Sequence, residues 1–128
     1  MRTRSPLSQP ITNSSEHQRV SNNAGLAGLP TSSAYVAAKH GVVGLTKTAA
    51  LEYAEVEIRV NAVCPGYIRT RMTEETMRRR GEAILAQIPV KRMGSPEEIA
   101  EIVVWLCPDR ASYVKGAAYS VDGGWMAT

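Results

Sequence analysis

A long amphipathic segment between residues 34 and 53 dominates the apolar pattern of the chain. Its apolar positions recur at helical spacing and share one face, which carries Val36, Val43 and Ala50. The hydroxyl residues at 31–33 supply the expected amino-terminal cap. Gly41 and Gly44 each cost about 1 kcal/mol against Ala in an exposed helix, so we expect them to permit close packing. The helix is therefore predicted to be buried on more than one side.

Two further segments show helical spacing. Residues 71–88 carry a helical pattern that is broken near Gly81, with charge on most faces, and they are predicted to form a mobile covering segment. The run from Ser95 to Glu98 has the spacing of a capping box with proline at the first helical position. The helix that it begins is predicted to end before Pro108, and its apolar stripe consists of Ile99, Ile102, Val103 and Leu106.

Branched apolar residues predict two strands. The first spans 58–64 and is ended by Pro65 and Gly66, and the second spans 117–121. A helix followed by a buried strand is half of an α/β crossover unit, so the predicted class is α/β with a parallel sheet. Ligands of such sheets bind at the carboxyl ends of the strands, which makes residues 65–70 the expected place of cofactor contacts.

The first 21 residues differ from the rest of the chain. They are polar, contain two prolines and show neither strand nor helix spacing. We therefore predict a disordered polar tail over 1–21 and a folded part over 22–128.

Composition limits the classes of function. The chain has 128 residues with 44% hydrophobic content, which fits one domain at most. A net charge of +3 without a basic stripe does not favour nucleic acid as a partner, and no apolar run is long enough for a membrane span. Cys64 and Cys107 lack metal-ligand spacing, so we expect no metal site, two free thiols and a reducing compartment, the cytoplasm.

Tyr35 and Lys39 form the candidate catalytic pair. Four residues make just over one helical turn, so the phenol and the ammonium project from the same face. A nearby cation favours a phenolate, which makes a phenol a usable acid or base near neutral pH. Proton exchange at a carbonyl or alcohol oxygen, coupled to hydride exchange at the adjoining carbon, is the reaction that such a pair suits.

Four motifs follow one another along residues 22–128. They are Tyr35-x-x-x-Lys39, Asn61-Ala62-Val63-Cys64-Pro65-Gly66-x-Ile68-x-Thr70, Arg92-x-Gly94-Ser95-Pro96-Glu97-Glu98-Ile99-Ala100, and Gly116 with Val121-Asp122-Gly123-Gly124. Their order and spacing resemble the carboxyl-terminal half of a short-chain dehydrogenase/reductase. The resemblance implies part of a Rossmann-type, doubly wound parallel sheet in an oligomeric enzyme that transfers hydride between NAD or NADP and an alcohol or ketone.

The resemblance also implies roles for individual residues. Tyr35 would be the acid/base, and Lys39 would favour its phenolate and hold the nicotinamide ribose, so both would contact the cofactor. The nicotinamide end would lie against Pro65, Gly66, Ile68 and Thr70. Residues 71–88 would form a lid over the substrate.

Position 22 departs from the family pattern. The family places a catalytic serine thirteen residues before the tyrosine, and this chain has Asn22 there. An amide can donate a hydrogen bond to a developing oxyanion, so Asn22 is a conceivable substitute with poorer geometry. Ser21 is adjacent, but a shift of one residue along an extended segment turns the side chain to the opposite face.

The first half of the family's fold has no counterpart in the sequence. No predicted strand is followed by a glycine fingerprint, so the pyrophosphate site of a dinucleotide is missing. Three interpretations remain: an active dehydrogenase, a truncated and weak or inactive fragment, and a non-catalytic fragment that pairs with full-length relatives. The second is favoured, and we expect either a homo-oligomer or association with a full-length relative. One edge of the strand at 58–64 is predicted to be open, because its neighbour would belong to the missing half.

Overall fold

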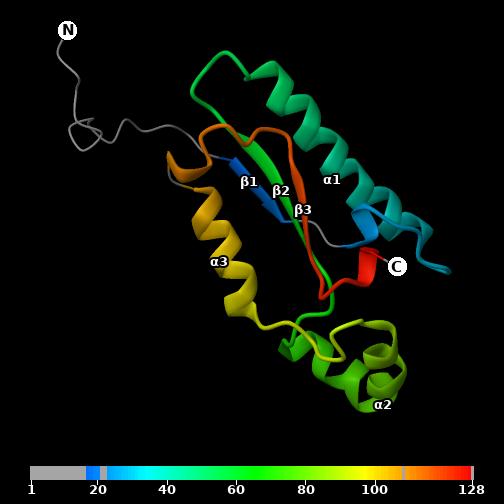
Figure 1. Cartoon of the computed structure of the whole chain (residues 1–128). Coiled ribbons are helices and arrows are strands. Elements are labelled where there is room, and N and C mark those ends of the chain that lie inside the picture. Colours follow the sequence, from blue (N-terminus) through cyan, green and yellow to red (C-terminus); the bar gives the residue numbers. More distant parts are fainter. Residues whose placement is uncertain (1–16, 21–22, 108, 128) are drawn as a thin grey trace, which may run out of the picture.

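A parallel sheet lies between two helices in the computed structural model, which describes residues 17–20, 23–107 and 109–127. The sheet has the order β1-β2-β3, with β1 at His17–Val20, β2 at Val60–Pro65 and β3 at Ala118–Val121. Helix α1 (Ser33–Glu52) lies on one side of the sheet and α3 (Pro96–Leu106) on the other, while α2 (Arg71–Gln87) lies beyond the carboxyl end of β2 (Figure 1). Three short 3-10 helices complete the fold: η1 (Asn23–Gly25), η2 (Asp109–Ala111) and η3 (Trp125–Ala127).

Strand β2 is the centre of the core, and all six of its residues are buried. Ala62 and Cys64 pack with Val43 on the α1 side. Val63 packs with Leu106 and Ala111 on the α3 side. Successive side chains of a strand point to opposite faces, so a strand covered on both faces has a continuous apolar run instead of an alternating one. The α/β class with a doubly wound parallel sheet is confirmed.

The predicted open edge of this strand is wrong. Strand β1 pairs with β2 in parallel, in a register that runs from His17 opposite Val60 to Val20 opposite Val63. The sequence places residues 17–20 in the predicted polar tail, because His-Gln-Arg-Val has no apolar alternation. Its strand conformation follows from pairing with a buried neighbour, which is a tertiary effect that local propensity does not contain.

Helix α1 begins and ends within one residue of its predicted bounds, but its predicted burial is wrong. Ser32 is the N-cap residue without a side-chain capping hydrogen bond. A Cβ atom added at Gly41 or Gly44 would meet no atom within 4 Å, and Leu51 is 79% exposed. One face of the helix is covered, through Val43, Thr46 and Ala50. Spacing identifies the residues that share a face, whereas burial depends on what lies opposite them.

The other two helices agree with the pattern of the sequence. The capping box of α3 is confirmed: the Ser95 amide donates to Glu98 Oε2 at 2.9 Å, and the Glu98 amide donates to Ser95 Oγ at 3.3 Å. Helix α2 contains one non-helical residue, Arg80, with φ of −134°. This kink lies next to Gly81, where the predicted helix is interrupted.

Both cysteines are free, as expected. Cys64 is buried and Cys107 is half-buried, and burial raises the pKa of the Cys64 thiol above its ordinary value. Within the part of the chain that the structure describes, no group of three or more His, Cys, Asp or Glu side chains could hold a metal ion. Among the same residues, none of the helices has the length and apolar content needed to cross a bilayer.

Two buried polar side chains connect β2 to the segments around it. Asn61 donates to the carbonyl of Val114 at 3.0 Å and accepts from the Ala117 amide at 3.0 Å, so it holds the turn that leads into β3. Arg59 donates through Nη2 to the carbonyls of Leu106 and Cys107 at 2.6 and 3.1 Å. A cation at the carboxyl end of a helix satisfies carbonyls that have no partner within the helix.

Asn61→Leu is expected to destabilise the fold. The substitution keeps the volume but takes the hydrogen-bond partner from the Ala117 amide and the Val114 carbonyl, both in half-buried residues, which costs about 1–3 kcal/mol in the free energy of unfolding. Urea unfolding followed by circular dichroism measures the change. Thr48→Val is the control, because this exposed hydroxyl bonds to a carbonyl of its own helix and its removal costs less than about 0.5 kcal/mol. An equal loss in the free energy of unfolding for Asn61→Leu and Thr48→Val would contradict the role given to Asn61.

Candidate active site

Predicted site residues from two separate segments line one cavity at the carboxyl end of β2. Its volume is about 280 Å³, and it contains Tyr35 from α1 together with Pro65, Gly66 and Ile68 from the segment after β2. Five further residues complete the lining: Ala24, Leu29, Tyr67, Thr73 and Trp125. The size is close to the lower end of the range for small-molecule pockets.

The segment after β2 is held in place by backbone hydrogen bonds. The Gly66 amide donates to the Val121 carbonyl at 3.0 Å. The Gly94 amide donates to the backbone carbonyl of Tyr67 at 2.9 Å. The Gly94 carbonyl accepts from the Arg69 amide, also at 2.9 Å. A Cβ atom at position 94 would lie 2.7 Å from Ile68 Cδ1, so a larger residue there would force the end of the Ile68 side chain to move. The glycine of the third sequence motif therefore positions a residue of the second.

Tyr35 and Lys39 meet on one face of α1, as their spacing predicts. Lys39 Nζ lies 5.5 Å from the centroid of the Tyr35 ring, within the range of a cation–π contact. The Tyr35 side chain is 47% exposed, so it is open to a ligand in the cavity.

Two of the predicted cofactor contacts, Lys39 and Thr70, do not line this cavity. Thr70 is the N-cap residue of α2 and is not among the residues that line the cavity. Thr73, one turn later, does line it, and its hydroxyl donates to the Ile68 carbonyl at 2.8 Å. The Thr70 amide donates to the same hydroxyl at 2.9 Å. Thr70 thus supports the start of α2 through Thr73.

One predicted site residue, Asn22, is outside the described residues.

The cavity also contains a residue that sequence reasoning missed, Trp125. Trp125 enters the cavity because the Asp122 carboxylate accepts from the Gly124 and Met126 amides at 3.0 Å each, which shapes η3. The sequence shows the Val-Asp-Gly-Gly motif at 121–124, but its spacing does not indicate that Trp125, the residue after it, reaches the cavity that contains Tyr35.

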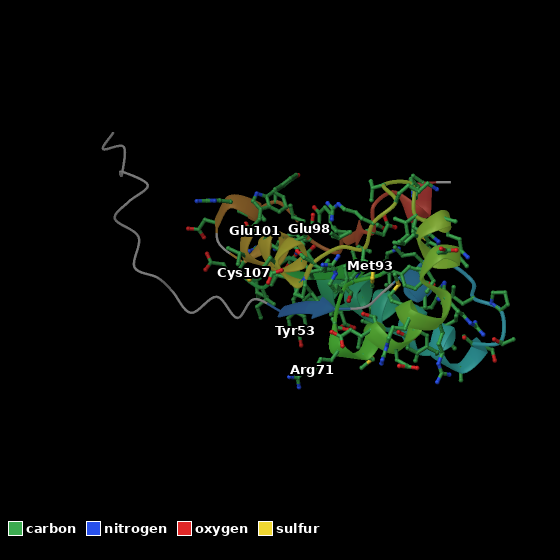
Figure 2. All side chains as sticks on the ribbon, turned by 90° about the horizontal axis from the view of Figure 1, so that it is seen from below. Tyr53, Arg71, Met93, Glu98, Glu101 and Cys107 are labelled. Carbon is green, nitrogen blue, oxygen red and sulfur yellow. The ribbon has the colours of Figure 1, made fainter. Side chains whose placement is uncertain are left out.

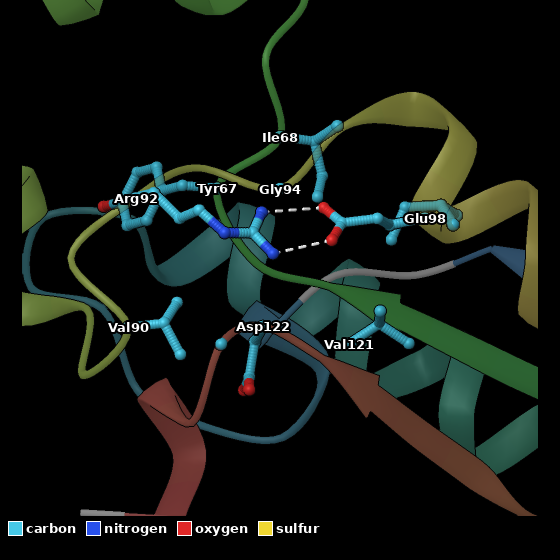
Figure 3. A pocket seen from close by; sticks show the side chains of 10 residues that line it. Tyr67, Ile68, Val90, Arg92, Gly94, Glu98, Val121 and Asp122 are labelled. Atoms are coloured by element: carbon cyan, nitrogen blue, oxygen red, sulfur yellow. Dashed lines mark hydrogen bonds and ion pairs between the residues drawn. The ribbon is translucent and has the colours of Figure 1, made fainter.

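A second, smaller cavity of about 170 Å³ shares Tyr67 and Ile68 with the first. An ion pair closes one side of it: Arg92 donates through Nη1 to Glu98 Oε2 at 3.0 Å and through Nη2 to Glu98 Oε1 at 2.7 Å (Figure 3). The Arg92 guanidinium, with help from the Ser95 amide, lowers the pKa of Glu98 from 4.5 to about 2.

This ion pair predicts a pH dependence of stability. Because folding lowers the pKa of Glu98, the pair stabilises the fold above about pH 4.5, and the contribution is lost as the pH falls towards 2. The difference in urea midpoint between the wild type and Glu98→Gln should therefore be largest above pH 5 and vanish near pH 2. Glu97→Gln, on the same helix, is the control. A difference that stays constant over this pH range would contradict the assignment.

The fold and the site together define a class: a parallel α/β domain of the nucleotide-binding type with a tyrosine–lysine pair at the carboxyl end of its central strand. Residues 11–126 match the family described as enoyl-(acyl carrier protein) reductase. The chain is 52% identical over 105 residues to a cyclohexanol dehydrogenase from Acinetobacter sp. (strain SE19), covering 81% of this chain and 40% of that protein. The chain belongs to the short-chain dehydrogenase/reductase family. The match begins at residue 11, upstream of the expected boundary at residue 22.

Solved structures give the same result. ElxO with NADP bound has a TM-score of 0.80 and 32% identity, over 88% of this chain and 47% of that one. A 4-hydroxyisoleucine dehydrogenase complexed with NADH has a TM-score of 0.80 and 35% identity, over the same shares of 88% and 47%. The chain thus spans less than half the length of each of these relatives. The relationship to NAD(P)-dependent oxidoreductases is confirmed.

Proposed function

We propose that this chain carries the proton-transfer part of an NAD(P)-dependent oxidoreductase site that acts on an alcohol or a ketone. The observation that supports it is the convergence of Tyr35, with Lys39 beside it, and the segment Pro65–Ile68 on one cavity at the carboxyl end of a central parallel strand. In open α/β sheets this end of the strands is where ligands bind. The relatives with bound NADP and NADH support the same cofactor class.

The residues around this cavity fit the nicotinamide end of the cofactor. Lys39 is the residue that would hold the ribose, next to Tyr35, and the ring would lie against Pro65, Gly66 and Ile68, with Thr70 at the start of α2. When bound, the cofactor supplies or accepts the hydride. The sequence contains no strand followed by a glycine fingerprint, so we find no residues that fit the pyrophosphate.

In the proposed reaction, Tyr35 handles the proton. Its phenol donates a proton to the carbonyl oxygen during reduction, and its phenolate accepts one from the alcohol during oxidation. Asn22, at the position of the family's serine, remains a predicted oxyanion donor with poorer geometry. The free thiols of Cys64 and Cys107 support a cytoplasmic setting.

The isolated chain is expected to bind NADH and NADPH weakly or not at all. The pyrophosphate is the largest polar anchor of the cofactor, and a helix amino terminus that would receive it is missing from the sequence pattern. Weak or undetectable turnover follows for the chain alone. Titration followed by nicotinamide fluorescence measures the affinity, with a full-length family member as the positive control. Micromolar affinity would show that this chain binds the dinucleotide in another way.

A second candidate is a non-catalytic fragment that pairs with full-length subunits of the same family. The observation in its favour is that the helices on both sides of the sheet expose apolar side chains. Leu45 on α1 is 58% exposed, and Val104 on α3 is 64% exposed. Co-purification of a tagged chain with a full-length relative, without gain of NAD(P)H turnover, would favour this candidate. Turnover by the chain alone would favour the first.

A further inference from the structure

A basic recess lies between α2 and the segment that leads to α3. Its volume is about 660 Å³, the largest of the three cavities described here. Four cationic side chains line it against one acidic side chain, Glu74; the cations are Arg69, Arg78, Lys91 and Arg92. The sequence shows arginines along 69–80 that a solvated helix face would explain. The structure instead brings two of them together with two cations from 91–92.

The four cations of this recess differ in whether they already form ion pairs or hydrogen bonds with other residues of the chain. Arg92 is bound to Glu98, and Arg78 is bound to Glu75. Arg69 forms no side-chain hydrogen bond or ion pair with any other residue that the structure describes. Lys91 Nζ donates to the Ala86 carbonyl at 2.7 Å, and an ammonium has three donors. Arg69 and Lys91 therefore have donors available for a ligand.

Apolar side chains also line the recess, which separates it from an ordinary solvated charge cluster. Met77 and Leu85 are half-buried and Met93 is buried, whereas Arg69 and Lys91 are exposed. Met93 is 7% exposed and lies within the body of the molecule, whereas Arg71 points away from it (Figure 2). A lining that combines apolar and cationic side chains fits a ligand with a short carbon skeleton and a negative group at one end.

The recess adjoins the candidate active site. Thr73 lines both the recess and the cavity that contains Tyr35, and Arg69 directly follows Ile68 of that cavity. The two cavities also meet the smaller one, since Ile68 lines the smaller cavity and the Tyr35 cavity, while Arg92 lines the smaller cavity and the recess. The recess and the Tyr35 cavity therefore lie on either side of the same residue, Thr73.

We propose that this recess binds the carboxylate or phosphate group of the substrate, so that the substrate class is an anionic hydroxy or keto compound. The proposal rests on the proposed function, because it places the reacting alcohol or carbonyl at Tyr35. Arg69 and Lys91 supply the charge-assisted hydrogen bonds. Met77 and Leu85 contact the carbon skeleton.

The test is a binding titration of the full chain without turnover. Succinate and inorganic phosphate serve as anionic probes and 1,4-butanediol as the uncharged analogue, at constant ionic strength, with binding followed by calorimetry. Both anions should bind and the diol should not. Arg69→Gln and Lys91→Gln should each weaken anion binding about tenfold, the effect of one charge-assisted hydrogen bond. Arg110→Gln is the control, because it removes the same charge on η2, at the far end of α3 from the recess (Figure 1).

The outcomes separate this proposal from the one on which it rests. Anion binding that is lost in the recess variants supports the recess, even if the chain shows no turnover with NAD(P)H. No anion binding, equal binding of the diol, or equal loss in Arg110→Gln overturns it, even if the chain oxidises uncharged alcohols. Displacement of succinate by NADPH would assign the recess to the phosphates of the cofactor and would overturn the assignment to the substrate.

Discussion

Replacing Tyr35 by Phe is expected to lower NAD(P)H turnover by about 10²–10⁴-fold, the usual contribution of a general acid or base. The prediction applies to any preparation in which this chain itself turns over the cofactor. The substitution removes the proton donor and keeps the ring, which already stands 47% exposed in its cavity. The loss should therefore lie in kcat and not in stability.

Matched substitutions test whether the effect is specific. Tyr53→Phe removes a phenol oxygen at the carboxyl end of the same helix, away from the cavity, and should leave turnover unchanged. Lys39→Ala should also lower turnover, because Lys39 lies beside the Tyr35 ring and is the residue proposed to hold the nicotinamide ribose. Lys47→Ala, an exposed lysine on α1, is the control and should leave turnover unchanged. Turnover that survives Tyr35→Phe would remove the proposed mechanism from this chain.

The features predicted correctly from the sequence are those that local interactions determine. Helix α3 is an example, because its capping box and its apolar stripe are encoded within a dozen residues. Strand β2 is another, since its branched apolar run has few alternatives to a buried strand. The contact between Tyr35 and Lys39 likewise follows from helical geometry alone.

The features that were missed depend on contacts between distant segments. The polar sequence of β1 becomes a strand through its register with β2. Trp125 reaches the Tyr35 cavity through the turn that Asp122 caps, some ninety residues further along the chain. The exposure of Gly41 and Gly44 shows the reverse error, because the helix face that they form has no neighbour among the described residues. Local pattern supplies the candidates for a face or a strand, and the tertiary partner decides their environment.

Exposed apolar side chains predict the oligomeric behaviour of the chain. Leu45 and Leu51 of α1 and Val104 and Trp105 of α3 are exposed. The two helices lie on opposite sides of the sheet (Figure 1). Strand β1 protects one edge of β2, so the open edge expected from the sequence no longer contributes to this argument. The apolar helix surfaces remain, and clusters of this kind on a small domain mark interaction sites.

We therefore expect the purified chain to self-associate at low micromolar concentration, or to be held in solution by a full-length relative. Size-exclusion chromatography with light scattering should give a mass above the 13.9 kDa of one chain. Burying a leucine side chain contributes about 1.5–3 kcal/mol, so Leu51→Gln should weaken association about tenfold or more. Glu52→Gln, at the next position of α1, is the control for a change that leaves the apolar surface intact.

The opposite result has an equally definite meaning. A sharp peak at 13.9 kDa, with cooperative thermal unfolding, would show that the three strands and their helices form a closed core without a partner. Because β1, β2 and β3 already pair in sequence order, such a core would need only α1 and α3 to cover the two faces of the sheet. Leu51 and Val104 would then be ordinary exposed residues, and the pairing of this chain with full-length subunits would lose its structural support.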